Sequence, residues 1–328
     1  MNNAVHSPLV SLINEVNAAI VGQSHVTKSM IIALLTGGHI LLEGLPGTAK
    51  TRAVKALSEA LNLGFSRIQF TPDLLPSDIT GAQLYHHDQG CLTFQPGPIF
   101  SPIVLADEIN RAPAKVQAAL LEAMAEGTVT VAGETRPLPS PFMVLATQNP
   151  VEQEGTYPLP EAQMDRFVMK IDVDYPSAEA ELAIVRLIRN EDMGLVDDTV
   201  FDSKRVLFEN QDFIIQEREM VKHAYVSESI DRYIVDLIIA TREPKRYSES
   251  KLAEWIEIGA SPRASIALDR CSRAHAHVEG RDYVTPDDVR SIAQAVLGHR
   301  ITLTFEAMSD GVTPSLVVDE ILRHVALV

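Results

Sequence analysis

Three short runs along the chain are apolar instead of alternating with polar positions. They are His39–Leu42, Ile103–Ala106 and Phe142–Ala146. Strands that are buried on both faces of a parallel sheet have this pattern, whereas half-exposed strands alternate. The three runs therefore predict central strands of a parallel sheet.

Segments with helical spacing lie before and between these runs. Residues 9–35 read as an amphipathic helix broken near 21–23, and Lys50–Asn62 and Pro113–Glu126 repeat apolar residues every three or four positions. Pro113 suits a first helical turn. The alternation of strands and helices across roughly residues 35–175 predicts a doubly wound α/β domain.

The pattern changes near residue 176, after which strand-like runs fade. Helical segments then follow at 177–190, 217–223, 229–242, 262–278, 286–295 and 314–324. Thr285 and Pro286 open one of these helices as a capping hydroxyl and a first-turn proline, so we interpret Asp287 and Asp288 as structural. The sequence thus predicts an α/β domain over residues 1–175 and a smaller, all-helical domain over 176–328.

Composition narrows the class of protein. Hydrophobic residues make up 46% and charged residues 22%, which is typical of globular chains, and 28 Lys+Arg against 44 Asp+Glu give a net charge of −16. An acidic chain with 5% aromatics is a poor nucleic-acid binder. Two distant cysteines, no long apolar run and no signal-peptide pattern favour a cytoplasmic protein without disulfides, structural zinc or a membrane span.

A glycine-bearing loop follows the first apolar run and precedes a helical segment. It reads Gly44-Leu45-Pro46-Gly47-Thr48-Ala49-Lys50-Thr51. In this context, backbone N–H groups and the helix dipole bind nucleotide phosphates, while Lys50 would reach the β- and γ-phosphates and Thr51 would bind Mg²⁺. Ala49 stands where the motif has glycine, and a tight turn with a solvated Lys50 is the structural alternative.

Two acids end the second apolar run. Asp107 and Glu108 lie where ligands bind in open α/β sheets, at the carboxyl end of a buried strand. Asp107 would hold Mg²⁺ and Glu108 would act as general base towards an attacking water. A polar strand end that caps the following turn is the alternative for the pair taken alone.

These segments together resemble one family. GLPGTAKT at 44–51 and DEINRAPAKVQ at 107–117 are similar to the corresponding segments of the MoxR family of AAA+ ATPases, and the resemblance extends over almost the whole chain. It implies a P-loop sheet domain followed by a helical lid, Mg²⁺-ATP as the bound nucleotide, and Ala49 as the usual variant of the loop.

The resemblance also implies roles for residues outside the two motifs. Val21 and Gly22 resemble the segment that lines the adenine pocket, and Asn149 resembles sensor 1, the polar residue that positions the attacking water. A helix break at Gly22 and a turn at Asn149 before Pro150 are the structural alternatives.

Two arginines acquire roles in the same way. Arg166 in Met-Asp-Arg-Phe resembles the arginine finger, which reaches a neighbouring subunit's site, and Arg263 resembles sensor 2 of the lid. An ion pair of Arg166 with Asp165 or another acid, and solvation of Arg263 at a helix start, are the alternatives.

Two insertions point to a subgroup and to partners. Residues 78–100 and 128–142 read as hairpins, which resemble those of the clade that holds magnesium chelatases and replicative helicases. The family resemblance implies a hexameric ring, partners with von Willebrand factor A domains, and chaperone-like or cofactor-insertion work on client complexes.

Two other functions compete with an ATP-hydrolysing motor. A nucleotide-gated scaffold would bind ATP with negligible turnover, although Glu108 and Arg166 are both present. A DNA-acting helicase relative is disfavoured by the charge of −16.

Overall fold

The computed structural model describes residues 8–20, 22–44, 50–88, 90–150, 155–193 and 212–327. The chain divides into two compact units. The sheet unit comprises residues 1–159 and 171–215, and the helical unit comprises residues 160–170 and 216–328.

A five-stranded sheet forms the core of the sheet unit. Its strands, in spatial order, are β2 (Phe65–Gln69), β5 (Ile103–Asp107), β8 (Met143–Gln148), β1 (Ile40–Gly44) and β9 (Met169–Val173). β2, β5, β8 and β1 pair in parallel. The three predicted runs form the inner strands, and their side chains are buried almost throughout. The predicted parallel α/β sheet is confirmed.

The two edge strands lacked a sequence signal. In β2 only Ile68 is buried, and in β9 buried residues alternate with more exposed ones. An edge strand packs less of its surface than an inner strand, so it needs no continuous apolar run.

Helices of the sheet unit follow the predicted periodicity. They are α1 (Pro8–Ala19), α2 (Ser24–Thr36), α3 (Lys50–Ala60), α5 (Ala114–Glu126) and α7 (Ala178–Asp192). α1 and α2 correspond to the broken helix expected over residues 9–35. Gly127 ends α5 with φ 64°, a left-handed conformation that glycine adopts at low cost.

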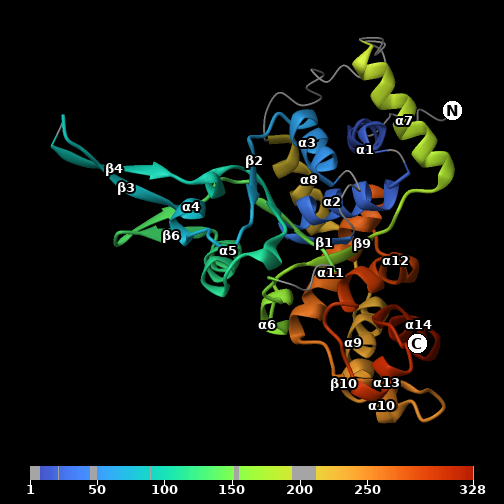
Figure 1. Ribbon diagram of the computed structural model, residues 1–328. Coiled ribbons are helices and arrows are strands. Elements are labelled where there is room, and N and C mark those ends of the chain that lie inside the picture. Colours follow the sequence, from blue (N-terminus) through green and yellow to red (C-terminus); the bar gives the residue numbers. More distant parts are fainter. Residues whose placement is uncertain are drawn as a thin grey trace. The chain divides into compact units, whose positions relative to one another are not determined.

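Two β-hairpins leave the sheet unit side by side (Figure 1). The short helix α4 (Pro76–Thr80) leads into β3 (Gly81–His86) and β4 (Cys91–Pro96), and β6 (Thr128–Val131) pairs with β7 (Glu134–Pro137). The Arg136 guanidinium lies 4.1 Å from the centre of the Phe94 ring, a cation–π contact that joins β7 to β4. Short 3-10 turns span Pro98–Phe100 and Ile109–Arg111.

The helical unit contains most of the remaining helices. They are α6 (Glu161–Met164), α8 (Asp212–His223), α9 (Glu228–Arg242), α10 (Leu252–Trp255), α11 (Pro262–Val278), α12 (Pro286–Leu297), α13 (Phe305–Ser309) and α14 (Pro314–His324), with a 3-10 turn at Pro244–Arg246. β10 (Ile256–Ile258) pairs antiparallel with β11 (Thr302–Leu303), so this region is helical but not all-helical as predicted. Strands of three and two residues are too short to show an alternation of apolar and polar positions in the sequence.

The compact units do not divide at residue 176. Residues 160–170 pack with the helical unit, and residues 171–193 pack with the sheet unit. The side chains that hold segment 160–170 in the helical unit come from residues far along the chain, such as Arg300 with Asp165. The predicted division into domains 1–175 and 176–328 stays a prediction.

Candidate functional site

The predicted phosphate loop, 44–51, lies partly outside the described residues. Leu45, Pro46, Gly47, Thr48 and Ala49 lie outside them, as does Val21. The described flanks have the predicted context, because β1 ends at Gly44 and α3 begins at Lys50.

Lys50 lies close to the acidic pair. Its Nζ donates to the Gly44 carbonyl at 2.6 Å. Burial lowers the pKa of the Lys50 ammonium, and the nearby carboxylates of Asp107, Glu108 and Glu43 act in the opposite direction. The structure therefore brings the end of the phosphate loop and the two acids together, as the sequence predicted.

Asp107 and Glu108 share one hydroxyl. Asp107 is the last residue of β5, and Glu108 follows with φ 58° and ψ 50°, a left-handed conformation that costs a non-glycine residue about 1–3 kcal/mol. The Thr147 Oγ1 accepts from the Glu108 N–H at 2.9 Å and donates to Asp107 Oδ1 at 2.6 Å. Thr147 is buried in β8, so it fixes both acids to the neighbouring strand.

Strand β2 supplies two further partners of the acids. Arg67 donates to Asp107 Oδ2 through Nε at 3.1 Å and Nη2 at 2.6 Å, and Gln69 donates to Glu108 Oε2 at 2.9 Å. Arg111 pairs with the same glutamate, with its Nε 3.2 Å from Oε2. Sequence reasoning missed Arg67, Gln69 and Thr147. Residues 65–69 carry no strand signal in the sequence, so nothing predicted β2 or its place beside β5.

Asn149 and Gly22 are also placed within the sheet unit. Asn149 is buried directly after β8, which lies between β5 and β1, so it belongs to the same carboxyl edge as Asp107. Gly22 has φ 83°, and a Cβ added there would meet the Ala180 Cβ at 2.6 Å. Gly22 therefore needs to be glycine for α7 to approach. Its predicted contact with adenine stays a prediction.

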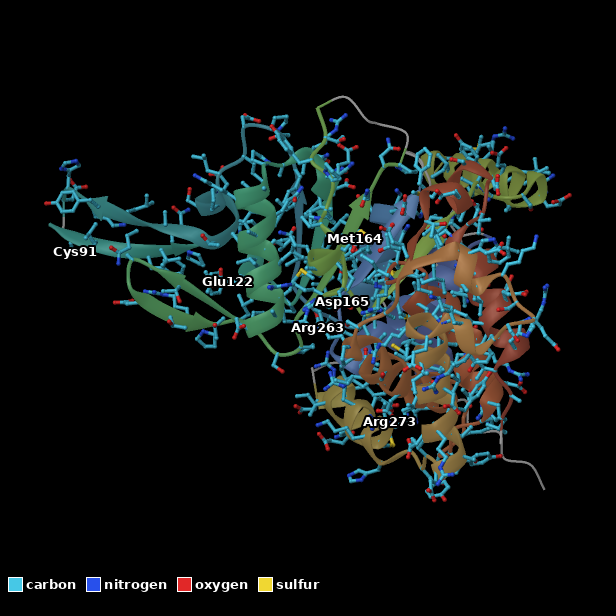
Figure 2. The ribbon with its side chains drawn as sticks, turned by 90° about the horizontal axis from the view of Figure 1, so that it is seen from below. Cys91, Glu122, Met164, Asp165, Arg263 and Arg273 are labelled. Carbon is cyan, nitrogen blue, oxygen red and sulfur yellow. The ribbon has the colours of Figure 1, made fainter. Side chains whose placement is uncertain are left out.

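Arg166 and Arg263 both belong to the helical unit. Arg166 lies in segment 160–170, and Arg263 is the second residue of α11. Ser261 caps α11: its Oγ accepts from the Arg263 N–H at 3.1 Å and donates to Asp165 Oδ2 at 2.8 Å. Figure 2 labels Asp165 and Arg263, which lie close together in that view. The two predicted arginines thus stand within one compact unit.

The donor set fits magnesium better than a tightly caged metal. Among the described residues, no group of three or more His, Cys, Asp or Glu side chains is placed to hold a metal ion. Mg²⁺ at a phosphate site needs only one or two protein ligands, because phosphates and water supply the rest. Asp107, whose carboxylate pairs with Arg67, and the hydroxyl of Thr51 in the first turn of α3 match that requirement.

Two histidines of α11 have acidic partners in the helical unit. The ring of His275 is 2.7 Å from Asp288 Oδ1, and His277 is 2.5 Å from Glu217 Oε2. Asp288 is fully buried and also accepts from Arg281 and from the Thr285 N–H, which agrees with a structural role for this acid. No described helix is long and apolar enough to cross a membrane.

Comparisons with known proteins identify the two regions. Residues 39–169 match a model described as "ATPase family associated with various cellular activities (AAA)", and residues 249–321 match the AAA lid domain.

Individual relatives match over nearly the whole chain. The Mycobacterium tuberculosis protein named Chaperone MoxR1 is 45% identical over 98% of this chain and 83% of its own. Protein YeaC of Bacillus subtilis is 43% identical over 98% of this chain and 95% of its own. A crystal structure of a Cytophaga hutchinsonii protein proposed to be an ATPase superposes with a TM-score of 0.90 at 45% identity, covering 98% of this chain and 95% of the other. With its parallel sheet, helical lid and clustered lysine and acids, the chain belongs to the MoxR family of AAA+ ATPases.

Proposed function

We propose that the chain binds Mg²⁺-ATP at the carboxyl edge of its sheet and hydrolyses the bond between the β- and γ-phosphates. One observation carries this proposal: Lys50, which begins α3, lies close enough to Asp107, which ends β5, and to Glu108, which follows it, for their charges to act on its ammonium. A cation for phosphates, a ligand for a metal and a general base are the groups that phosphoryl transfer to water requires.

Each described residue has a defined task in the proposed reaction. Lys50 holds the β- and γ-phosphates, and Thr51 and Asp107 hold Mg²⁺, which when bound neutralises charge on the phosphate oxygens. Asn149 orients the attacking water, since a side-chain amide both donates and accepts. Glu108 takes a proton from that water while the water oxygen bonds to the γ-phosphorus. The bond between the γ-phosphorus and the oxygen that bridges it to the β-phosphate breaks, which leaves ADP and phosphate.

The two arginines complete the site in an assembled ring. Arg166 acts on the nucleotide of a neighbouring subunit, where a planar, permanently charged guanidinium stabilises the charge that develops on the transferred phosphoryl. Arg263 contacts the nucleotide from the lid, together with Val21, Gly22 and the loop 45–49. Family membership supports the ring, which we propose to be a hexamer.

The work performed is remodelling of client protein complexes in the cytoplasm. Two observations support it: a relative is named a chaperone, and the two joined hairpins project from the sheet unit where they are accessible to a client (Figure 1). Partners with von Willebrand factor A domains and cofactor or metal insertion follow from the family resemblance alone.

A single substitution separates hydrolysis from a nucleotide-gated scaffold. Glu108→Gln removes the general base but keeps the side chain's volume, so steady-state phosphate release should fall by about two to four orders of magnitude while ATP binding survives. Glu122→Gln, an exposed glutamate of α5, is the matched control and should release phosphate at the wild-type rate. Unchanged release by Glu108→Gln would contradict the hydrolase mechanism.

A further inference from the structure

Arg300 uses every hydrogen-bond donor that its side chain has. It lies between α12 and β11, and only 3% of its side chain is exposed. Its Nε donates to Asp165 Oδ1 at 2.7 Å, its Nη2 donates to the carbonyls of Asp165 and Phe167, and its Nη1 donates to the carbonyls of Val168 and Val296. A guanidinium has five N–H donors, so its hydrogen bonding is complete.

Four of the five acceptors belong to residues within two positions of Arg166. They are the carboxylate and carbonyl of Asp165 and the carbonyls of Phe167 and Val168. The ring of His299 adds a contact of 3.1 Å to the Phe167 carbonyl, and the Phe167 side chain is fully buried. The backbone on both sides of Arg166 is therefore held by His299 and Arg300, which lie more than 130 residues later in the sequence than the groups they contact there.

The contact needs both the charge and the planar shape of an arginine side chain. Burial lowers the pKa of the Arg300 guanidinium, and its hydrogen bond and charge interaction with Asp165 act against that shift. Lysine carries the same charge but offers three donors from one point, so it cannot reproduce a planar fork that reaches five acceptors.

The same carboxylate reaches the start of α11. Asp165 Oδ1 accepts from Arg300, and its Oδ2 accepts from Ser261, whose Oγ in turn caps the N–H of Arg263. One aspartate therefore connects the segment of Arg166 to the first turn of the helix that carries Arg263.

We propose that Asp165 and Arg300 form a clamp that positions Arg166 for its action on a neighbouring subunit's nucleotide, and that neither residue touches the nucleotide. The clamp rests on the proposed function, in which Arg166 is the arginine finger. A preorganised guanidinium stabilises a transition state without first having to be ordered. Loss of the clamp therefore reduces turnover without weakening ATP binding at Lys50.

Two conservative variants test the clamp. Asp165→Asn retains the volume of the side chain and removes its charge, while Arg300→Lys retains the charge and removes the fork. Each should lower kcat by about 100-fold, the loss that a displacement of about 1 Å produces at a catalytic group, with the Kd for ATP unchanged within about twofold. If Arg300→Lys fails to fold, as thermal unfolding will show, Asp165→Asn carries the test alone.

Asp288→Asn is the matched control. It removes the charge of another aspartate in the same helical unit, one that accepts from Arg281 and from the Thr285 N–H. It should lower the unfolding temperature at least as much as Asp165→Asn but leave kcat per folded subunit within about twofold, since Asp288 lies outside the clamp.

Mixed assemblies distinguish a positioning role from general damage. Asp165→Asn subunits keep an intact ATP site, so mixing them with Lys50→Ala subunits, which keep an intact Arg166, should restore activity. Mixing them with Arg166→Ala subunits should restore none, because both variants lack a working finger.

Three outcomes would overturn the clamp, and they separate it from the proposed function. If Asp165→Asn and Arg300→Lys keep full kcat while Arg166→Ala is inactive, the clamp alone is refuted. The clamp alone is also refuted if mixing Asp165→Asn subunits with Arg166→Ala subunits restores activity. Full activity in Arg166→Ala refutes both the arginine finger and the clamp. The proposal of ATP hydrolysis is then still tested separately by Glu108→Gln.

Discussion

Asp107 in the sheet unit and Asp165 in the helical unit have hydrogen-bond partners of the same chemical types. Each accepts from one arginine and one hydroxyl: Asp107 from Arg67 and Thr147, and Asp165 from Arg300 and Ser261. Both aspartate side chains are 17% exposed. The arginines differ, because the Arg67 side chain is 49% exposed whereas that of Arg300 is 3% exposed.

This difference separates an exchangeable contact from a permanent one. A guanidinium in water gives up an ion pair at little cost, while a buried one has no water to replace its lost partner. In the proposed function, Arg67 can therefore leave Asp107 when Mg²⁺ binds there, whereas Arg300 has no comparable alternative to Asp165. The same chemical arrangement would serve catalysis in one unit and positioning in the other.

The largest expected effect concerns the exchangeable carboxylate. Asp107→Asn should lower Mg²⁺-dependent ATP turnover by about three orders of magnitude, because a neutral amide is a weak ligand for Mg²⁺. Phosphate release measured across a Mg²⁺ series checks this. Asp88→Asn, an exposed aspartate beyond β3, is the control and should match the wild type; equal activity of Asp107→Asn would remove Asp107 from the metal site.

Stability should distinguish the two arginines. Arg300→Met removes a buried guanidinium and leaves the Asp165 carboxylate and four backbone carbonyls without their donor, so it should cost about 3–5 kcal/mol of unfolding free energy. Arg67→Met breaks an exposed pair and should cost no more than about 1 kcal/mol. Urea unfolding of both variants, followed by circular dichroism, checks the difference. Equal losses would refute the contrast between permanent and exchangeable contacts.

The shared hydroxyl should matter for turnover. Thr147→Val leaves the Glu108 N–H without its acceptor and releases Asp107 Oδ1, so kcat should fall by about tenfold, with a loss of about 1–3 kcal/mol in stability. Thr147→Ser, which retains the hydroxyl, should keep most of the turnover.

A matched control exists for the buried hydroxyl. Within the part of the chain that the structure describes, the buried Thr27 Oγ1 makes no hydrogen bond. Thr27→Val should therefore leave turnover unchanged and stability unchanged or improved. If Thr147→Val and Thr27→Val behave alike in an ATPase assay, Thr147 has no special role.

The smallest effect concerns competition for Asp107. Arg67→Met removes the cation that pairs with this carboxylate, so half-saturation of turnover should need about fivefold less Mg²⁺, which corresponds to an ion pair worth about 1 kcal/mol. Lys55→Met, an exposed lysine of α3 paired with Glu59, controls for the change in net charge. An unchanged or higher Mg²⁺ requirement in Arg67→Met would show that the two cations do not compete.

Local sequence predicted the groups that follow directly from a strand or a loop. Asp107 and Asn149 stand just past the ends of apolar runs, Lys50 follows the loop after another run, and parallel strands bring such ends to one edge. The inner strands and most helices were predictable for the same reason, since burial on both faces and helical periodicity are properties of neighbouring residues.

The partners of these groups were not predictable from local pattern. Gln69 and Arg67 reach the acids only because β2 lies beside β5, and strand order is a property of the whole sheet. Arg300 meets Asp165 across 135 residues, so no spacing in the sequence relates them. The grouping of segment 160–170 with the helical unit depends on that distant contact, which explains why it too escaped prediction.

Calorimetric titration of ATP with Mg²⁺ into the wild-type chain and into Lys50→Ala tests the central claim most directly. We expect saturable binding of one nucleotide per wild-type subunit and a loss of binding of about 100-fold or more in Lys50→Ala, because Lys50 supplies a charge-assisted contact to the phosphates. The absence of heat from nucleotide binding to the folded wild-type chain, or equal affinity in both proteins, would contradict an ATP site between the start of α3 and the acids that end β5.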